Sequence, residues 1–243
     1  MAKILLIETS SEVCSTAISV DGKVVAISEN PETQSHAALL TLQVDECCRT
    51  AHLTLAQLDA VAVSKGPGSY TALRVGSSVA KGICYALDKP LLAIDTLQAL
   101  AFAAQNAFAA NHPATGTPST IFFPMLDARR QEVWLAAYDA ALNELLPAQP
   151  LILENNSFEM FAKANLGSTV PGWIVLAGNG MKKVRSGSFP ENVSFSEVEK
   201  CSARHLSLLA EQHFQSKNFQ DIAYFEPIYM KPPNITTPGK PLF

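Results

Sequence analysis

The residues best suited to chemistry stand at Gly66–Thr71, which read GPGSYT between an apolar run and a helical one. A glycine-rich turn at the start of a helix can bind phosphate through free backbone N–H groups. A Walker A loop needs Gly-Lys-Ser/Thr, and a GxGxxG loop needs a third glycine where Thr71 stands. The turn therefore predicts a strand-to-helix connection, in which Ser69 caps the helix through its hydroxyl and the helix N-terminus is at most a weak anion site.

A second polar group lies in the second half of the chain. Asp127, Arg129 and Glu132 fall at the turn between the apolar runs IFFPMLDA and EVWLAAYD. They could meet a ligand in a cleft between two lobes, or they could form an ion pair at the surface. Gly178 and Gly180, in a GNG turn, are typical of a strand-to-helix connection, with nucleotide contact as the alternative.

The sequence offers little for metal or nucleophilic chemistry. Its five histidines form no HExxH or HxxxH pair, and Leu40 stands four residues after His36, where a second ligand would fall. No GxSxG sequence supports a serine nucleophile, and Cys14 lies in a predicted strand. The five cysteines show no CxxC spacing, which favours reduced structural thiols. We expect no metal site and no catalytic residue in this chain.

Composition and charge narrow the class of protein. Hydrophobic residues make up 48% of the 243 residues and charged residues 16%, which predicts a folded chain rather than a disordered one. The net charge of −4 disfavours tight nucleic-acid binding by this chain alone. No run of about 18 apolar residues and no cleavable leader pattern is present, so we expect a cytoplasmic protein without a membrane role.

Hydrophobic periodicity predicts two related α/β lobes. The first half follows the order βββαβαβα, with a hairpin turn at Asp21 and Gly22 and parallel strands added through helical crossovers. The second half repeats the strand-turn-strand opening after a turn-rich stretch at 111–119. We therefore expect an N-terminal lobe at 1–110, a smaller C-terminal lobe at 111–218 and an extended proline-rich tail at 219–243. The helices of the first lobe should span 36–52, 71–87 and 97–110.

The first two of these helices carry more apolar surface than one sheet should need. An uncharged arc of about 200° on the helix at 71–87 exceeds the roughly 100° stripe that packs on a sheet. It includes Leu73 and a ridge of small residues at i, i+4 spacing, Ala72, Gly76, Ala80 and Cys84. On the helix at 36–52, Ala38, Leu39 and Leu42 lie opposite the stripe expected to face the sheet. Either a partner chain or this chain's own second lobe or tail should cover these faces.

Four segments resemble the bacterial TsaB proteins, also labelled YeaZ or glycoprotease-like. They are LLIETSSEVCSTAIS, SKGPGSYTALRVGSSVAKG, LDARRQEVW and FEPIYM, in matching order and approximate spacing. The resemblance covers nearly the whole chain and is densest in the first half. It implies an actin-like ATPase (ASKHA, ribonuclease H-like) fold, with two related lobes of mixed sheets flanked by helices. It also implies a noncatalytic dimerisation subunit of the complex that makes N6-threonylcarbamoyladenosine on tRNA.

The resemblance also implies partners. A TsaD-like catalytic subunit would pair with the helices at 36–52 and 71–87, and a TsaE-like ATPase would join that pair. The chain would contact tRNA only through the complex, would form a homodimer in isolation, and would need no cofactor of its own, because ATP and a metal belong to the partner subunits. The implied partner-binding residues are Ala38, Leu39, Leu42, Ala72, Leu73, Gly76, Ala80 and Cys84.

One departure from related nucleotide-hydrolysing proteins bears on activity. Glu8 stands where they place a metal-holding aspartate, and Thr9 and Ser10 follow it without glycine. A longer carboxylate and a β-branched neighbour crowd a phosphate turn. We expect at most weak ligand binding in a cleft formed by Glu8, Thr9, Ser10, Asp127, Arg129, Glu132, Gly178 and Gly180. The alternatives are a glycoprotease-like peptidase, a nucleotide-binding actin-like kinase or ATPase, and a tRNA-binding module.

Overall fold

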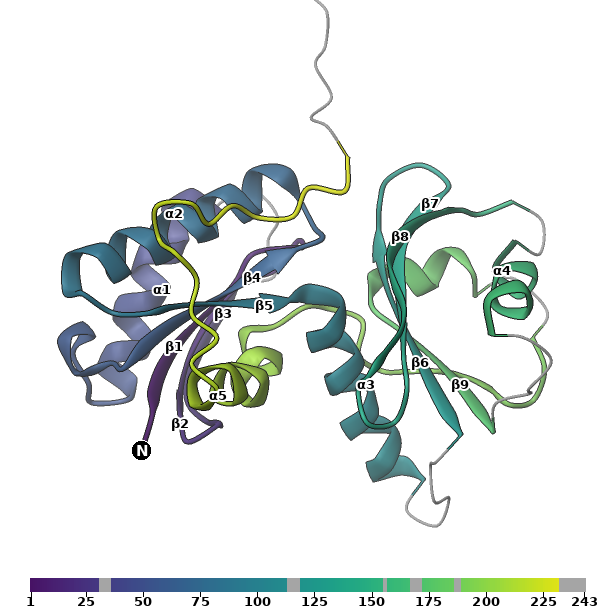
Figure 1. Ribbon diagram of the computed structural model, residues 1–243, viewed down its shortest axis with the longest axis horizontal. Coiled ribbons are helices and arrows are strands. Elements are labelled where there is room, and N and C mark those ends of the chain that lie inside the picture. The colour runs from purple at the N-terminus through teal and green to yellow at the C-terminus, as the bar shows by residue number, and fades with distance from the viewer. Residues whose placement is uncertain (31–35, 113–118, 155–156, 167–171, 186–188, 232–243) are drawn as a thin grey trace, which may run out of the picture.

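The structure is a computed structural model that describes residues 1–30, 36–112, 119–154, 157–166, 172–185 and 189–231. Two lobes stand side by side, each built on a five-stranded sheet (Figure 1). The expected turn-rich boundary at 111–119 and the expected tail at 219–243 fall partly outside the described residues.

The first sheet has the strand order β3-β2-β1-β4-β5. Its strands are β1 (Lys3–Glu8), β2 (Cys14–Val20), β3 (Lys23–Asn30), β4 (Ala60–Gly66) and β5 (Leu91–Asp95). β1, β2 and β3 are antiparallel, whereas β4 and β5 run parallel to β1. Asp21 and Gly22 both have positive φ, as a two-residue hairpin turn between right-twisted strands requires. The predicted hairpin and crossover strands are confirmed.

The second sheet has the order β10-β9-β6-β7-β8. Its strands are β6 (Thr120–Asp127), β7 (Glu132–Tyr138), β8 (Glu144–Ile152), β9 (Trp173–Ala177) and β10 (Val193–Phe195). β6, β7 and β8 are antiparallel, and β9 and β10 run parallel to β6. Both sheets thus share one connectivity, which confirms the expected actin-like fold of two related lobes with mixed sheets. The sequence did not predict β8 or β10.

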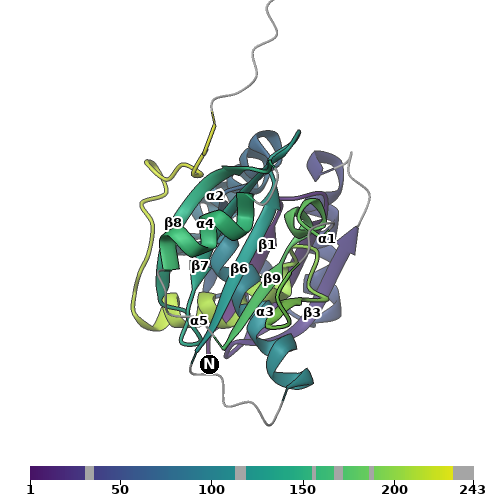
Figure 2. The ribbon, with the colours of Figure 1, turned by 90° about the vertical axis from the view of Figure 1, so that its right-hand side faces the viewer.

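Helices cover both faces of each sheet. α1 (His36–Thr50) and α2 (Tyr70–Leu87) lie on one face of the first sheet, and α5 (Ser207–Gln215) with the short η3 (Ala203–Leu206) lies on the other (Figure 1). α4 (Ser157–Leu166) lies in front of the second sheet and α3 (Thr96–Asn111) behind it (Figure 2). Two further short turns are η1 (Leu55–Gln57) and η2 (Asn179–Lys183).

Two helices pack on the sheet of the other half of the chain. α3 precedes the second sheet in sequence, yet Leu100 and Phe108 of α3 pack with Phe122 and Leu126 of β6. α5 follows the second sheet, yet Leu209 and Ala210 pack with Ile4 and Leu6 of β1. The expected limits of 1–110 and 111–218 therefore describe the order of the sheets along the chain, whereas the helical layers cross between the lobes.

The small-residue ridge of α2 faces its own sheet. Ala72, Leu73, Gly76, Ala80 and Cys84 are 0–6% exposed, and a Cβ on Gly76 would lie 2.3 Å from Thr9 Oγ1. The prediction that these five residues bind a partner is therefore wrong. Small side chains on this ridge serve to bring the helix backbone close to β1 and β4. Leu39, also predicted to bind a partner, is half-buried.

A different set of residues forms the exposed surface of these helices. On α1, Ala38 is exposed and Leu42 is 64% exposed, as predicted for these two residues. On α2, Tyr85 is 85% exposed, and Gly82 has nothing within 4 Å of a built Cβ. We call six uncharged members of the exposed set the outer helix face; they are Ala38, Leu42, Ser78, Gly82, Tyr85 and Ala86.

Residues 219–231, here called the C-terminal strap, cross the first lobe as an extended segment (Figure 1). Gln220 N donates to Leu91 O at 2.8 Å on the edge of β5, and Phe225 is buried in the core beneath α2. Lys81 of α2 donates to the carbonyls of Ala223 and Phe225. The described part of the tail therefore covers one flank of α2, as one sequence alternative allowed.

Replacing each of two glycines of α2 with alanine should change the stability of the fold in opposite directions. Gly76→Ala places a Cβ against Thr9 and should lower the free energy of unfolding by about 1–3 kcal/mol. Gly82→Ala meets open space and should raise it by about 0.5–1 kcal/mol, because alanine favours the helix. Urea unfolding midpoints measure both changes. A Gly76→Ala protein as stable as the wild type would contradict the packing described for the ridge.

Candidate functional site

The proposed ligand cleft consists of two groups of residues, one at the end of each central strand. The first group, Glu8, Thr9 and Ser10, ends β1 and is buried. Glu8 Oε1 accepts hydrogen bonds from Ser10 N at 2.6 Å and from Ser64 Oγ at 3.1 Å. Burial raises the pKa of Glu8 above its ordinary value, and these hydrogen bonds offset only part of that effect. Glu8 therefore serves as an internal hydrogen-bond acceptor of the first lobe.

The GPGSYT turn packs directly on this strand end. Ser69 N donates to Ser10 O at 2.7 Å, and a Cβ on Gly68 would lie 2.4 Å from the same oxygen. Gly66 has φ of +105°, and a Cβ there would lie 2.6 Å from Ile228 O of the strap. The glycines allow close contact between backbones, and Gly66 also adopts a positive φ, which glycine tolerates best. Among the described residues, Ser69 occupies the N-cap position without a side-chain capping bond, so the predicted hydroxyl cap is wrong.

The residues present do not fit the metal and nucleotide that an actin-like fold implies. The carboxylate of Glu8 is buried and bonded within the lobe, and the backbone of the turn lies against Ser10. Within the described ranges, no group of three or more His, Cys, Asp or Glu side chains could hold a metal ion.

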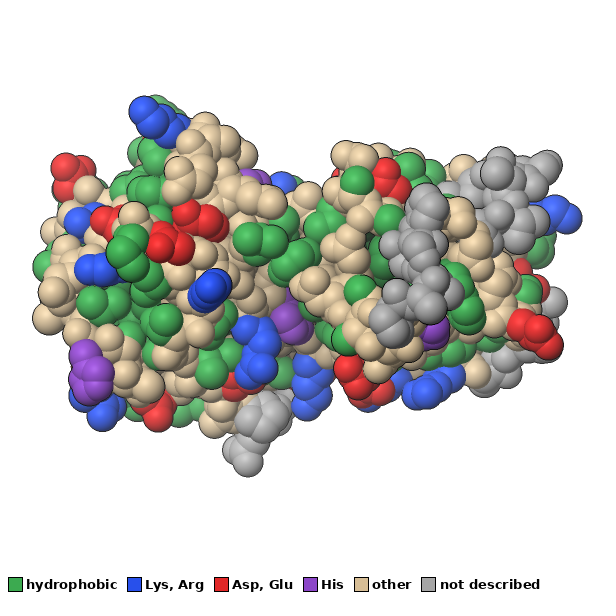
Figure 3. All heavy atoms as spheres, turned by 90° about the horizontal axis from the view of Figure 1, so that it is seen from below, with side chains coloured by type: hydrophobic (Ala, Val, Ile, Leu, Met, Phe, Trp, Pro, Cys, Tyr) green, Lys and Arg blue, Asp and Glu red, His purple; other side chains and the backbone are tan. Residues whose placement is uncertain are grey.

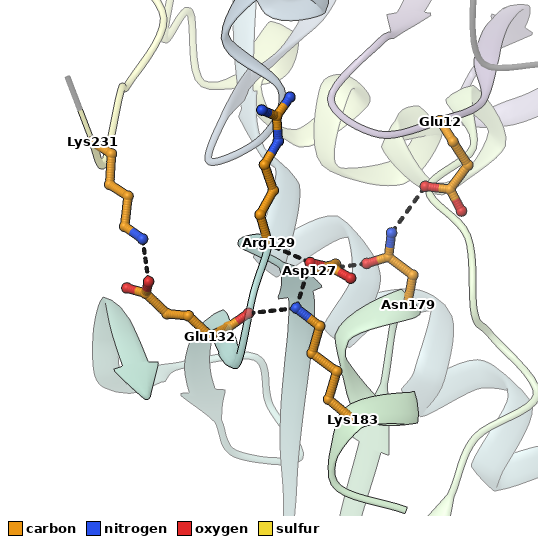
Figure 4. Close-up of polar contacts among 7 residues, drawn as sticks. All are labelled: Glu12, Asp127, Arg129, Glu132, Asn179, Lys183 and Lys231. Atoms are coloured by element: carbon orange, nitrogen blue, oxygen red, sulfur yellow. Dashed lines mark hydrogen bonds and ion pairs between the residues drawn. The ribbon is translucent and has the colours of Figure 1, made fainter. Parts of the chain in front are cut away.

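The second group lies at the ends of β6 and β7 (Figure 4). Lys183 Nζ is 2.5 Å from Asp127 Oδ1 and donates to Glu132 O at 3.0 Å, while the Glu132 carboxylate pairs with Lys231 of the strap. Arg129 N donates to Asp127 Oδ1 at 2.6 Å, but its side chain extends away from that carboxylate (Figure 4). Both carboxylates are thus in ion pairs, but with Lys183 and Lys231, which the sequence did not identify, and not with Arg129, the cation of the predicted group.

The GNG turn supplies a contact between the lobes. Gly178 has φ of +88°, and Cβ atoms on Gly178 and Gly180 would meet the backbone of β6 at 2.2 and 2.9 Å. Between them, Asn179 Nδ2 donates to Glu12 Oε2 at 2.9 Å, and Asn179 Oδ1 accepts from Asp127 N at 2.9 Å (Figure 4). Sequence analysis missed Asn179 and Glu12. The only sequence signal for these two residues was a polar residue, Asn179, placed between two glycines.

The structure therefore brings Asp127, Glu132 and the GNG turn together but leaves Glu8 bonded inside its own lobe. The two predicted groups are joined only indirectly, through Glu12 and Asn179. This arrangement fixes the lobes relative to each other. It does not pair a free acid with a free base.

A groove of about 690 Å³ lies elsewhere, between the β2–β3 hairpin, α3 and η3. Its ionisable lining residues are Arg204, which pairs with Glu29, and His205. Burial, assisted by nearby Arg204, lowers the pKa of His205 to about 4. Sequence analysis missed this groove, because its lining comes from separate segments between Gly22 and Leu208.

Within the described ranges, no helix is both long and apolar enough to cross a membrane.

Comparison with known proteins places the chain in a family. Residues 26–238 match the family model described as TsaD, tRNA N6-adenosine threonylcarbamoyltransferase. The chain belongs to this family.

Its full-length relatives within the family are TsaB proteins. The Haemophilus influenzae protein named "tRNA threonylcarbamoyladenosine biosynthesis protein TsaB" is 26% identical, over 94% of this chain and 93% of that protein. The Escherichia coli K12 protein of the same name is 25% identical, over 94% of each chain. These matches confirm the TsaB resemblance inferred from the sequence motifs.

A solved structure of YeaZ from Pseudomonas aeruginosa matches this TsaB-family chain with a TM-score of 0.70. The match covers 94% of this chain and all of that one, at 24% sequence identity. At this identity the likeness concerns the fold alone.

The buried Glu8 makes a testable contribution to pH dependence. Its folded-state pKa is raised, so the native state favours the protonated acid, and its contribution to stability should decline as pH rises from the ordinary glutamate pKa through the raised value. The unfolding free energy of the wild type relative to Glu8→Gln should therefore fall with increasing pH. Urea unfolding across mildly acidic to mildly alkaline pH measures this difference. A difference that grew with pH would mean that the native state favours the ionised carboxylate.

Proposed function

We propose that this chain acts in tRNA threonylcarbamoyladenosine biosynthesis, as a noncatalytic subunit that pairs with a TsaD-like catalytic protein. The names of its full-length relatives support the pathway. The observation that carries the pairing is the outer helix face, a set of exposed, uncharged side chains on two neighbouring helices, with the charged Asp45, Glu46 and Arg49 of α1 also exposed. Apolar surface of this kind is typical of a protein interface.

The outer helix face suits close helix packing. Ser78, Gly82 and Ala86 follow one another at i, i+4 spacing along the exposed side of α2. Side chains this small allow the backbone of a partner helix to approach closely. Tyr85, beside this row on α2, and Leu42, on the neighbouring α1, are large exposed side chains that a partner could bury. Lys81, which would interrupt this surface with a charge, is turned toward the strap instead.

The TsaD family model supports the identity of the partner. A chain that matches this model over residues 26–238 shares its fold with a TsaD-like protein, which should carry an equivalent pair of helices. Two such helix pairs can pack about a pseudo-twofold axis. In the absence of the partner, the same face should pair isologously with a second copy of this chain.

The noncatalytic role is supported by the chemistry that the described residues lack. Glu8 is buried, and Asp127 and Glu132 are held in ion pairs. We therefore propose that this chain requires no cofactor of its own, and that ATP and a metal act in partner subunits. A TsaE-like ATPase would join the pair. The same observations give no support to a peptidase or kinase, because neither a nucleophile with a base nor a metal site is formed by the described residues.

Substituting Gly82 with leucine tests the pairing. The leucine side chain should prevent close approach of a partner helix and weaken association with the organism's TsaD-like protein at least about tenfold, a loss of about 1.4 kcal/mol. The fold should be unaffected, because the position is open and leucine favours a helix. Co-purification and the mass of the co-expressed complex measure association.

Gly82→Ala is the conservative control, since it keeps the ridge small. Met160→Arg on α4 controls for a change on another exposed surface. Undiminished association by Gly82→Leu, with a normal melting temperature, would contradict the proposed pairing.

A further inference from the structure

Three separate segments that carry cationic side chains approach one another beside the junction of the lobes, on the side where the described strap ends (Figure 1). Arg74 belongs to α2, Arg129 and Arg130 to the turn between β6 and β7, and Lys231 to the strap. The proposed function assigns no role to this cluster. On α2 the outer helix face begins at Ser78, one turn or about 6 Å after Arg74, and extends from there away from the cluster to Ala86.

Side-chain contacts connect these segments in sequence. Arg74 Nε donates to Tyr229 Oη at 3.3 Å, and its guanidinium lies 4.4 Å from the centre of the Tyr70 ring. The Tyr70 and Tyr229 rings are 4.5 Å apart. Two residues further along the strap, Lys231 pairs with Glu132, at the end of the turn that carries Arg129. The cluster is thus continuous from α2 to the second lobe.

The two arginines of the turn are exposed and available. Within the described ranges, neither Arg129 nor Arg130 takes part in an ion pair, and the Arg129 side chain projects beyond the Asp127–Lys183 pair toward the first lobe (Figure 4). Their backbones have φ of 69° and 48°, in the left-handed region. This geometry suits glycine or asparagine and costs other residues about 1–2 kcal/mol each. The turn holds arginines at two positions where the backbone alone would favour smaller residues.

The local charge is opposite in sign to that of the whole chain. The cations are Arg74, Arg129, Arg130, Lys183 and Lys231, and the carboxylates beside them are Glu12, Asp127, Glu132 and Glu226. Five positive and four negative groups leave a local charge of about +1, on a chain whose net charge is −4. The face that carries α5, by contrast, intersperses acidic and basic side chains without a continuous field of one sign (Figure 3).

We propose that this junction cluster binds RNA, with Arg129 and Arg130 on backbone phosphates and the Tyr70–Tyr229 pair beside an unstacked base. The proposal rests on the proposed function for the identity of the RNA, which is the tRNA to be modified. It adds a direct tRNA contact by this chain to a role otherwise limited to supporting a partner.

The arrangement favours RNA over other anions. The cations are spread along a surface that crosses two lobes, which suits a chain of phosphates better than a single small anion. Tyrosine rings with an adjoining guanidinium are the side chains on which unpaired bases stack, and an acidic peptide would gain nothing from them. The small local excess of charge predicts modest affinity, consistent with a surface that shares the tRNA with a partner subunit.

The test is a substitution that removes both guanidinium groups and keeps the turn. Arg129→Asn with Arg130→Gly places in the turn the residues that its left-handed backbone favours, so the fold should be retained. Lys163→Gln with Lys217→Gly is the matched control: both lysines are exposed, Lys217 also has a left-handed backbone with φ of 56°, and the same charge is removed. Fluorescence anisotropy with a labelled unmodified tRNA transcript measures affinity at several salt concentrations, for the chain alone and with its TsaD-like partner.

The arginine double variant should bind tRNA about tenfold more weakly, with a salt dependence reduced by about one to two phosphate contacts, and the lysine control should change affinity less than about twofold. This result supports the inference whether or not the TsaD-like protein associates, so failure of the pairing would be seen separately by co-purification. Three results would each overturn the inference. The two double variants could lose tRNA affinity equally, or the wild type could bind no tRNA either alone or with its TsaD-like partner. Polyglutamate at equal charge could also displace the tRNA.

Discussion

Close contact between α2 and the first sheet is the constraint on which the rest of this structure depends. Gly76 leaves no room for a side chain beside Thr9, and the small residues one turn to either side of it are buried against the same sheet. Once that side of the helix faces inward, the opposite side, with Gly82 and Tyr85, must face outward. The orientation of one helix thus determines both the tight packing of the core and the surface left for a partner.

The same close packing explains why the residues at the end of β1 have a structural role. The GPGSYT turn that starts α2 contacts Ser10, and Glu8 turns inward to accept bonds from Ser10 and Ser64. On the second lobe, Asp127 and Glu132 are neutralised by lysines, and Asn179 joins that lobe to Glu12. Polar residues that in other sequences could surround a ligand here hold two lobes in a fixed arrangement.

Much of the fold could be predicted from the sequence, because its elements follow local rules. The Asp21–Gly22 turn, the strand LLAID and the helical period of α1 and α2 each carry their own signal. β8 carries the opposite signal, since Pro147 and Pro150 argue against a strand, and only its place at the edge of the sheet makes them acceptable. The crossing of α3 and α5 to the other sheet depends on contacts between distant residues, which periodicity cannot locate.

The candidate site shows the same limit. A helical wheel identified the apolar excess of α2, but it could not tell which part of the arc would meet the sheet, so the inward ridge was taken for the outward one. Asp127 and Glu132 were found because they cluster in sequence, while their partners Lys183 and Lys231 lie far along the chain.

The crossing of the helices also bears on how the chain acquires its structure during synthesis. When the first sheet and α3 have emerged from the ribosome, one face of that sheet is still uncovered, because α5 ends only at Gln215. The packing surface of α3, on β6, does not yet exist at that point. The second lobe can be completed only after β10 ends at Phe195, and the first only after α5 ends at Gln215, so apolar surface stays exposed on the nascent chain until late in translation.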